Sequence, residues 1–160
     1  MNKKIYLLLS LVFIFVFQTF AYATLQVTVD PASINLGSFN LNDDTRDLPR
    51  DRTIRVICTT DQGNPWELKI NLESLLANLD NPSAVIPETN FWWYGFRTNG
   101  TGSLVTTDQD FSLERVVYTS SPLEGNGEVI VEVKFRIKIP NSTQSGNYGT
   151  RVLFTIVETA

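Results

Sequence analysis

Histidine is absent from this 160-residue sequence, and cysteine occurs only once. Without histidine the chain can build neither a Ser-His-Asp nor a Cys-His catalytic arrangement, nor a zinc or copper site based on histidine and cysteine. The single Cys58 has no partner for an internal disulfide, so the core must hold without one. Cys58 alternates with Ile54 and Val56, which favours a small buried side chain over a bridge between chains.

Long apolar runs are also missing, except for one at the start, "IYLLLSLVFIFVF". Lys3 and Lys4 precede this run, and Ala21-Tyr22-Ala23 follows it as a small-x-small cleavage site. The run is short for a bilayer span, which favours a cleaved signal peptide over a membrane anchor. We therefore expect residues 1–23 to be a signal peptide. The mature chain, residues 24–160, is then secreted to an extracellular, cell-surface or periplasmic location, with no membrane span after signal cleavage.

The mature chain is small and acidic. Its length suits one domain. Loss of Lys3 and Lys4 reduces the 13 basic residues to 11, against 17 acidic residues, which gives a net charge of −6. Nucleic acids and anionic membranes repel such a surface, so neither is an expected partner.

Two-residue alternation of apolar and polar residues dominates the mature chain. In "GEVIVEVKFRIKIP" the valines, isoleucines and phenylalanine face one way and the charged residues face the other. Turn-rich stretches such as "DQGNP" and "LEGNG" separate these segments. The pattern predicts an all-β chain, a single antiparallel β-sandwich of the immunoglobulin-like kind over residues 24–160.

Two segments carry more specific predictions. The last strand, "YGTRVLFTIVE", is fairly apolar on both faces, which predicts that it is central or covered on its second side. Helical signal is scarce, and only "ESLLANL" is predicted to form one or two turns before Pro82.

The three tryptophans fall into two different patterns. Trp66 alternates with Leu68 and Ile70 in "WELKINL", which predicts a core anchor. The block "NFWWYGF" instead has aromatics on both faces, with Trp92, Tyr94 and Phe96 on one of them. A strand of a two-layer sandwich has one dry side. Either a loop covers this second set, which is the favoured reading, or it forms an exposed aromatic platform for sugars or proteins.

Acidic residues provide weak candidates for catalysis. A glycosidase needs two carboxyl groups about 5 to 9.5 Å apart across a cleft. Asp108 and Asp110 could share a strand face, and Glu88 lies upstream of the aromatic block. Nothing in the sequence marks any two of them as a pair, so we predict no catalytic residues and no enzymatic activity. The sequons at Asn99 and Asn141 matter only in a host that glycosylates.

Residues 40–51 match a calcium-binding loop at some positions and depart from it at others. Asn40, Asn42 and Asp44 have the spacing of oxygen ligands. Thr45 stands where the EF-hand template needs glycine, and Asp51 stands where it needs glutamate. We therefore predict a solvated polar loop, with no metal and no cofactor.

Several motifs resemble secreted bacterial domains of the WxL type. In that family one strand carries Trp-x-Leu, here Trp66-Glu67-Leu68, and the final strand carries a second copy. Here the second copy reads Phe154-Thr155-Ile156 and follows a "Pro…Gly-x-Tyr" connection that ends at Tyr148. The resemblance implies a β-sandwich attached non-covalently to a Gram-positive cell wall, although the second tryptophan is missing. We expect Trp66, Leu68, Tyr148, Phe154 and Ile156 to be core positions.

A second resemblance is to pilin-like domains of the spore coat protein U type. These begin with an FG-x-[YF] strand, here Leu36-Gly37-Ser38-Phe39, and continue to a V-x-C-T strand, here Val56-Ile57-Cys58-Thr59. In that family the cysteine has a disulfide partner, which this chain lacks. This resemblance implies assembly by strand exchange, in which a neighbour's strand completes an unfinished sheet.

The sequence therefore predicts an exported, non-catalytic protein with a structural or adhesive role at a cell surface. Its expected partners are cell-wall glycan or other surface proteins. The alternatives are a pilin-like or spore-coat-like subunit and, more remotely, a carbohydrate-binding or carbohydrate-active protein. The oligomeric state stays open.

Overall fold

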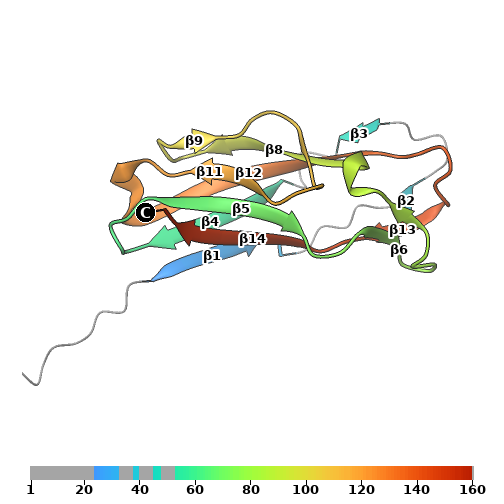
Figure 1. The fold of residues 1–160 in the computed structure, drawn as a ribbon, viewed down its shortest axis with the longest axis horizontal. Helices are drawn as coiled ribbons and strands as arrows, with labels where there is room; N and C mark the ends of the chain where they lie inside the picture. Colours follow the sequence, from blue (N-terminus) through green and yellow to red (C-terminus); the bar gives the residue numbers. More distant parts are fainter. Residues whose placement is uncertain (1–23, 33–37, 40–44, 48–52, 160) are drawn as a thin grey trace, which may run out of the picture.

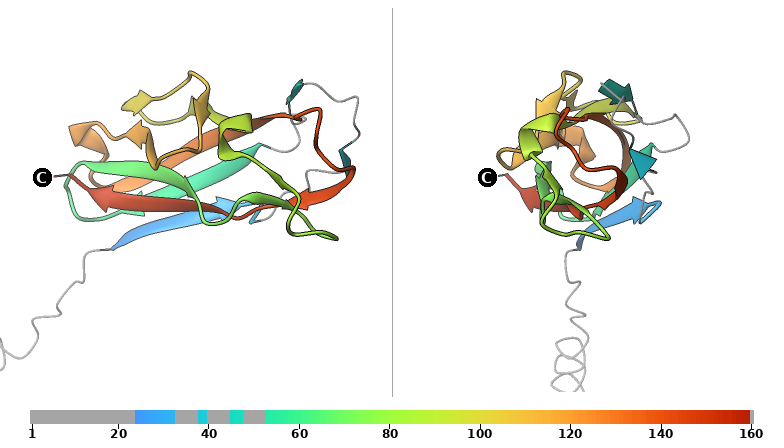
Figure 2. Two further views of the ribbon diagram at one scale, coloured as in Figure 1. Left: turned by 45° about the vertical axis from the view of Figure 1, so that its right-hand side comes forward. Right: turned by 90° about the vertical axis from the view of Figure 1, so that its right-hand side faces the viewer.

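The computed structural model describes residues 24–32, 38–39, 45–47 and 53–159. Nearly all regular structure in these ranges is β-strand, and the paired strands run antiparallel. Two sheets pack face to face over a shared core (Figures 1 and 2). The prediction of an all-β antiparallel sandwich is thus confirmed. No helix within the described ranges is long and apolar enough to cross a membrane.

The large sheet has β12 near its centre. Its strand order is β1 (Leu25–Asp30), β4 (Ile54–Thr60), β12 (Gly127–Lys138), β8 (Phe91–Thr98) and β10 (Gln109–Asp110), and β3 (Thr45–Asp47) also pairs with β12. β4 pairs with the first half of β12, and β3 pairs with its last three residues. β8 runs along the other edge of β12, so the two strands present adjacent rows of side chains.

The second sheet covers the inner face of the first. Its order is β14 (Val152–Glu158), β5 (Trp66–Leu72), β11 (Arg115–Thr119) and β9 (Ser103–Leu104). A smaller sheet closes one end of the sandwich, in the order β2 (Ser38–Phe39), β13 (Gly146–Gly149), β6 (Leu76–Asn78) and β7 (Val85–Ile86) (Figure 1). Two short 3-10 turns, η2 (Glu88–Asn90) and η3 (Pro122–Glu124), lie between strands.

The core follows from the alternation of the strands. On β12 every second residue is buried between the sheets, and the residues between them face outward. Phe91 and Phe135 of the large sheet stack with Phe111, at centroid distances of 4.8 Å from Phe91 and 6.2 Å from Phe135. Burial of such rings provides most of the free energy that holds a small domain without disulfides together.

Trp66 lies at the other end of this core with no exposed surface. Its indole Nε1 donates a hydrogen bond to the carbonyl of Glu124 (3.0 Å), and its ring lies 5.5 Å from that of Tyr118. The Tyr118 hydroxyl donates to the Glu124 carboxylate (2.8 Å), and burial raises the pKa of Tyr118 to about 12. Burial alone would raise the pKa of Glu124, but hydrogen bonds from the N–H groups of Thr101 and Ser121 and from Tyr118 outweigh it and lower that pKa.

Cys58 is buried on β4 and is a free thiol. Burial raises its pKa to about 12. The thiol therefore stays protonated near neutral pH, which makes it a poor nucleophile and a poor metal ligand.

The helical turns predicted in "ESLLANL" are wrong. Residues 76–78 form β6, which pairs with β7 and β13. Leu76 is buried, and the Asn78 side-chain oxygen accepts hydrogen bonds from the N–H groups of Asp80 and Asn81, which closes a turn before Pro82. A segment this short gains little as a helix, so pairing with β13 decides its structure.

The predicted central or covered position of the last strand is also wrong. β14 is at the end of its sheet and pairs with β5 alone among the described strands. Its outward residue Leu153 is 49% exposed. β14 runs beside β1, the edge strand of the large sheet, without pairing with it (Figures 1 and 2). We call this junction of two edge strands the β1/β14 seam.

A cleft of about 270 Å³ opens at the β1/β14 seam. Val29 of β1 and Val152 of β14 form its sides, and the aromatic rings of Phe91 and Phe135 reach it from the core. Core residues therefore line a cleft between two strands that are at the edges of their sheets among the described residues, although Phe91 and Phe135 are only 2% and 3% exposed.

Candidate functional site

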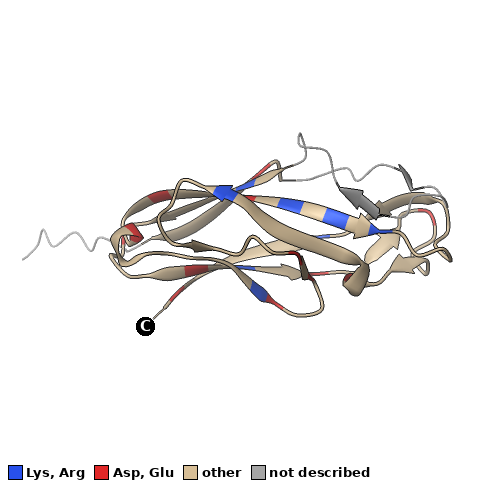
Figure 3. Cartoon of the chain, turned by 90° about the horizontal axis from the view of Figure 1, so that it is seen from above, with Lys and Arg blue, Asp and Glu red and all other residues tan. Residues whose placement is uncertain are grey.

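The outer face of the large sheet is where the structure gathers exposed aromatic and basic side chains. Trp92 and Tyr94 alternate outward along β8 and are half-buried. In the register of the sheet Trp92 is opposite Arg136, and Tyr94 is opposite Lys134, both on β12. Lys138 continues the same row, and Figure 3 shows the basic residues of β12 one after another along the strand.

A β-bulge in β8 interrupts this alternation. Val133 of β12 is opposite Gly95, and the preceding Glu132 is opposite Arg97, so Phe96 is the extra residue. A bulge of this kind turns neighbouring side chains to the same side of a sheet. Phe96 and Arg97 are accordingly both exposed, with 38% of Phe96 accessible.

The sequence pattern did not reveal the outward position of Arg97. Strict alternation puts Arg97 on the inner face, one residue out of phase with Phe96. The one available signal was Gly95 in the middle of an aromatic strand, because an isolated glycine in a strand often marks a bulge.

Arg97 holds a nearly buried carboxylate beside the bulge. Its Nε and Nη2 each donate to a carboxylate oxygen of Glu132 at 2.7 Å, and Glu132 is only 8% exposed. The hydrogen bond to Glu132, together with the attraction of its charge, raises the pKa of Arg97 above its ordinary value. This ion pair fixes the guanidinium on the outer face.

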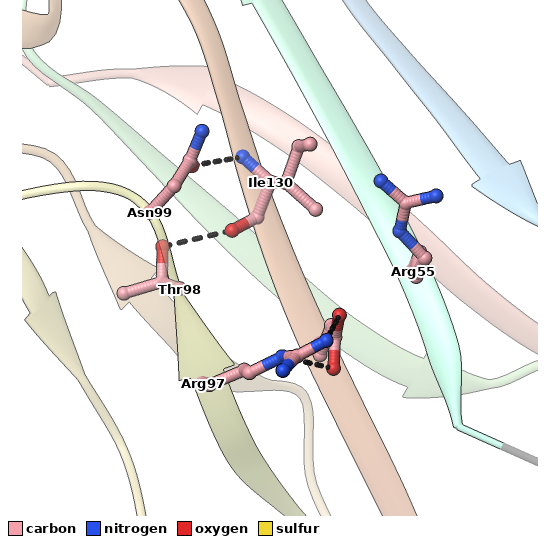
Figure 4. Close-up of a pocket in the computed structure, with 6 residues that line it drawn as sticks. Arg55, Arg97, Thr98, Asn99 and Ile130 are labelled. Carbon is pink, nitrogen blue, oxygen red and sulfur yellow. Dashed lines mark hydrogen bonds and ion pairs between the residues drawn. The ribbon is translucent and has the colours of Figure 1, made fainter.

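A shallow hollow of about 340 Å³ lies over β4, β12 and β8 at this point (Figure 4). Thr98 donates to the carbonyl of Ile130 (2.9 Å), and Asn99 accepts from the N–H of Ile130 (2.7 Å). Arg55 reaches the hollow from β4, on the opposite side of β12 from Arg97. Two guanidinium groups thus flank one carboxylate, Glu132.

Cations also lie over the aromatic rings. The Lys134 Nζ is 3.9 Å from the centroid of the Phe96 ring, and the Arg97 guanidinium is 6.0 Å from the same ring. The Arg136 guanidinium is 5.9 Å from the Tyr94 ring. Such contacts orient both partners, each contributing about 0.5 to 1 kcal/mol at an exposed position. We name Trp92, Tyr94, Phe96, Lys134 and Arg136 the basic–aromatic face.

The charge of this region is opposite to that of the protein. The three central strands β4, β8 and β12 carry five basic residues and two acidic ones, for a local net charge of +3, whereas the whole chain has a formal charge of −4. The basic residues are Arg55, Arg97, Lys134, Arg136 and Lys138, and the acidic ones are Glu128 and Glu132.

The candidate catalytic carboxylates have local partners. Asp108 forms an ion pair with Arg136. Asp110 accepts hydrogen bonds from the hydroxyl and N–H of Ser112, which lower its pKa. Glu88 begins η2. Neither the seam cleft nor the hollow is lined by any of these three carboxylates.

The structure places one of the two sequon asparagines near the candidate site but describes none of the candidate calcium ligands. The candidate calcium ligands that the sequence disfavours, Asn40, Asn42, Asp44 and Asp51, all lie outside the described residues. Within the described residues no group of three or more acidic or cysteine side chains could hold a metal ion. Of the sequon residues, Asn99 is exposed at the rim of the hollow, and its side chain is hydrogen-bonded to Ile130.

The WxL-like motif positions lie inside the sandwich. Trp66 and Leu68 have no exposed surface, Tyr148 and Phe154 are buried, and Ile156 is half-buried. Among the aromatic side chains that the structure describes, Trp92, Tyr94 and Phe96 are the ones that reach the surface. A ligand that stacks on described aromatic residues therefore contacts this set and not the motif tryptophan.

Comparison with known proteins gives no further identification, because no protein-family model, curated protein or solved structure matches this chain.

Proposed function

We propose that the chain is an exported, non-catalytic β-sandwich with an adhesive role at a cell surface, and that the basic–aromatic face makes the contact. The observation that carries this proposal is the outward row of Trp92, Tyr94 and Phe96, beside basic residues of β12. Exposed aromatic side chains combine a large apolar area with few rotatable bonds, which suits them to contacts with sugars and proteins. The resemblance to WxL-type domains supports cell-wall glycan as a partner. Burial of Trp66 and Leu68 moves the expected contact to the outer face.

A retention assay with isolated cell-envelope material tests this proposal. Replacing Trp92 and Tyr94 together by alanine is expected to reduce retention at least tenfold, because two stacking surfaces are lost. Leu123→Ala is the matched control, since Leu123 is 90% exposed on η3, away from this face. Equal retention of the double variant, the control and the unchanged protein would reject the contact face.

A second candidate function is assembly through the β1/β14 seam, in line with the pilin-like resemblance. The specific observation is a cleft lined by core residues at the junction of two strands that are at sheet edges among the described residues. An extended strand from another molecule could hydrogen-bond to such an edge and fill the cleft with alternate side chains.

Sedimentation velocity separates the two candidates. The adhesive module predicts a monomer at all concentrations, whereas strand addition predicts polymers that grow with concentration. Val152→Asp places a charge in the wall of the cleft and is expected to abolish such polymers. Circular dichroism must show that this variant is still folded, and polymers of unchanged size would exclude the seam as the interface.

A further inference from the structure

We propose that the ligand of the basic–aromatic face is a negatively charged polysaccharide. In this arrangement a carboxylate or sulfate group of the polymer meets Lys134, and its sugar rings stack on Trp92, Tyr94 and Phe96. This inference rests on the proposed function and names the chemical class of its ligand.

The first argument is the placement of charge. Lys134, Arg136 and Lys138 are at alternate positions of one strand, so neighbouring side chains are about 7 Å apart and repel each other. A sheet stabilised only by its own charges would place a carboxylate opposite each of these cations. Arg136 follows this rule, because it is opposite Asp47 of β3 and forms an ion pair with Asp108. Lys134 does not: it is opposite Tyr94, and its charge lies over the Phe96 ring with no ion pair among the described residues. The structure therefore maintains positive charge here without neutralising it at Lys134.

The second argument is the contrast between this face and the opposite sheet. On β5 the outward Lys69 forms an ion pair with Glu114 (3.7 Å) and has Glu67 on the same face of its strand. The outward residues of β14 include the apolar Leu153 and Val157. The two outer faces thus differ in that Lys134, unlike Lys69, lies over an aromatic ring and has no ion pair among the described residues.

The third argument is the shape of the surface. Trp92, Tyr94 and Phe96 form a row along β8, and the bulge at Phe96 extends the row toward the hollow where Arg55 and Arg97 lie. An extended polymer can follow such a row, with rings on one strand and charges on the next. A small ligand would need an enclosed pocket, and the hollow is open to solvent.

The same arguments disfavour other polyanions. The basic strip is about two strands wide and is bordered by Asp108 and Asp110 at β10 and by Glu128 on β12. A nucleic acid duplex or an anionic bilayer would cover these carboxylates as well, and the acidic protein as a whole repels such dense charge. A polysaccharide with one charge per sugar fits the narrow strip.

The experiment is a fluorescence titration with polygalacturonate, dextran sulfate and neutral dextran. Trp66 and Trp93 have no exposed surface, so a spectral change reports on the half-buried Trp92. The polyanions are expected to bind at least tenfold more tightly than neutral dextran. Raising the salt concentration from 50 to 500 mM should weaken polyanion binding severalfold, because it screens the exposed charges.

Charge-reversal variants identify the face. Lys134→Glu is expected to weaken polyanion binding at least tenfold. Lys69→Glu, a matched reversal on the outer face of the opposite sheet, should change it less than twofold. Equal losses in the two variants would mean that only net charge matters, and this would overturn the proposal.

Two other outcomes would reject the polysaccharide inference but leave the proposed adhesive function standing, and a third would reject both. Neutral dextran that binds as tightly as polygalacturonate would leave an adhesive face without selectivity for charge. Tighter binding to duplex DNA or to phosphatidylserine vesicles would assign a different polyanion. If, in addition, envelope retention does not depend on Trp92 and Tyr94, the proposed function fails as well.

Discussion

Replacing Trp66 by alanine is expected to lower the free energy of unfolding by about 3 to 5 kcal/mol. The ring is completely buried, so its removal leaves a large cavity between β5 and the large sheet. The variant also loses the hydrogen bond from the indole to the carbonyl of Glu124 and the contact with the Tyr118 ring. For a domain of this size with no disulfide, such a loss is a large share of the total stability, about 5 to 15 kcal/mol.

Urea denaturation followed by circular dichroism measures this effect. Trp92→Ala is the matched control, because it removes the same side chain from the outer face, where Trp92 is half-buried. We expect the control to cost about 1 kcal/mol or less. Equal losses in the two variants would contradict the assignment of Trp66 to the core and Trp92 to the surface.

Sequence periodicity predicts much of this fold because burial between two sheets acts on every second residue of a strand. Trp66 and Leu68 share a face in the sequence, and both are fully buried in the structure. β12 shows the same agreement over its whole length, apart from Glu132, which is buried by its ion pair with Arg97.

The features that sequence reasoning missed depend on pairing between distant segments. β6 is a strand because Tyr148 and Gly149 of β13 pair with it, some seventy residues away. β14 is an edge strand because the order of strands, and not their composition, decides which of them has two neighbours. Local patterns contain neither kind of information.

The candidate site could be predicted only in part for the same reason. Alternation placed Trp92, Tyr94 and Phe96 on one face, but it could not decide between a covering loop and solvent. The structure leaves Phe96 exposed and sets Lys134 beside it, a neighbour more than thirty residues away in the sequence. The charge of the face, on which the inferred ligand depends, arises from this pairing of β8 with β12.

Gly95 lies beside the bulge that shapes this face and packs against Leu104 and Val105, so Gly95→Ala is expected to have the second large effect. A Cβ atom at this position would lie 2.4 Å from Leu104 Cδ1 and 2.8 Å from the carbonyl oxygen of Val105. That oxygen accepts a hydrogen bond from the Gly95 N–H (2.8 Å), so it cannot move away without breaking the bond. We expect a loss of about 2 to 3 kcal/mol in the free energy of unfolding, at the upper end for overpacking.

Gly149→Ala is the control, because its Cβ would meet only the side chain of Leu79, which is 68% exposed and free to turn aside. Its expected cost is below about 1 kcal/mol. Gly95→Ala should also weaken polygalacturonate binding, even at temperatures where the variant is fully folded. The added methyl group pushes against Leu104 and Val105, and the resulting shift of β8 displaces the neighbouring Phe96 and Arg97 on the outer face. A variant as stable as the unchanged protein, with unaltered binding, would show that β8 accepts a side chain at Gly95 without moving Phe96 and Arg97.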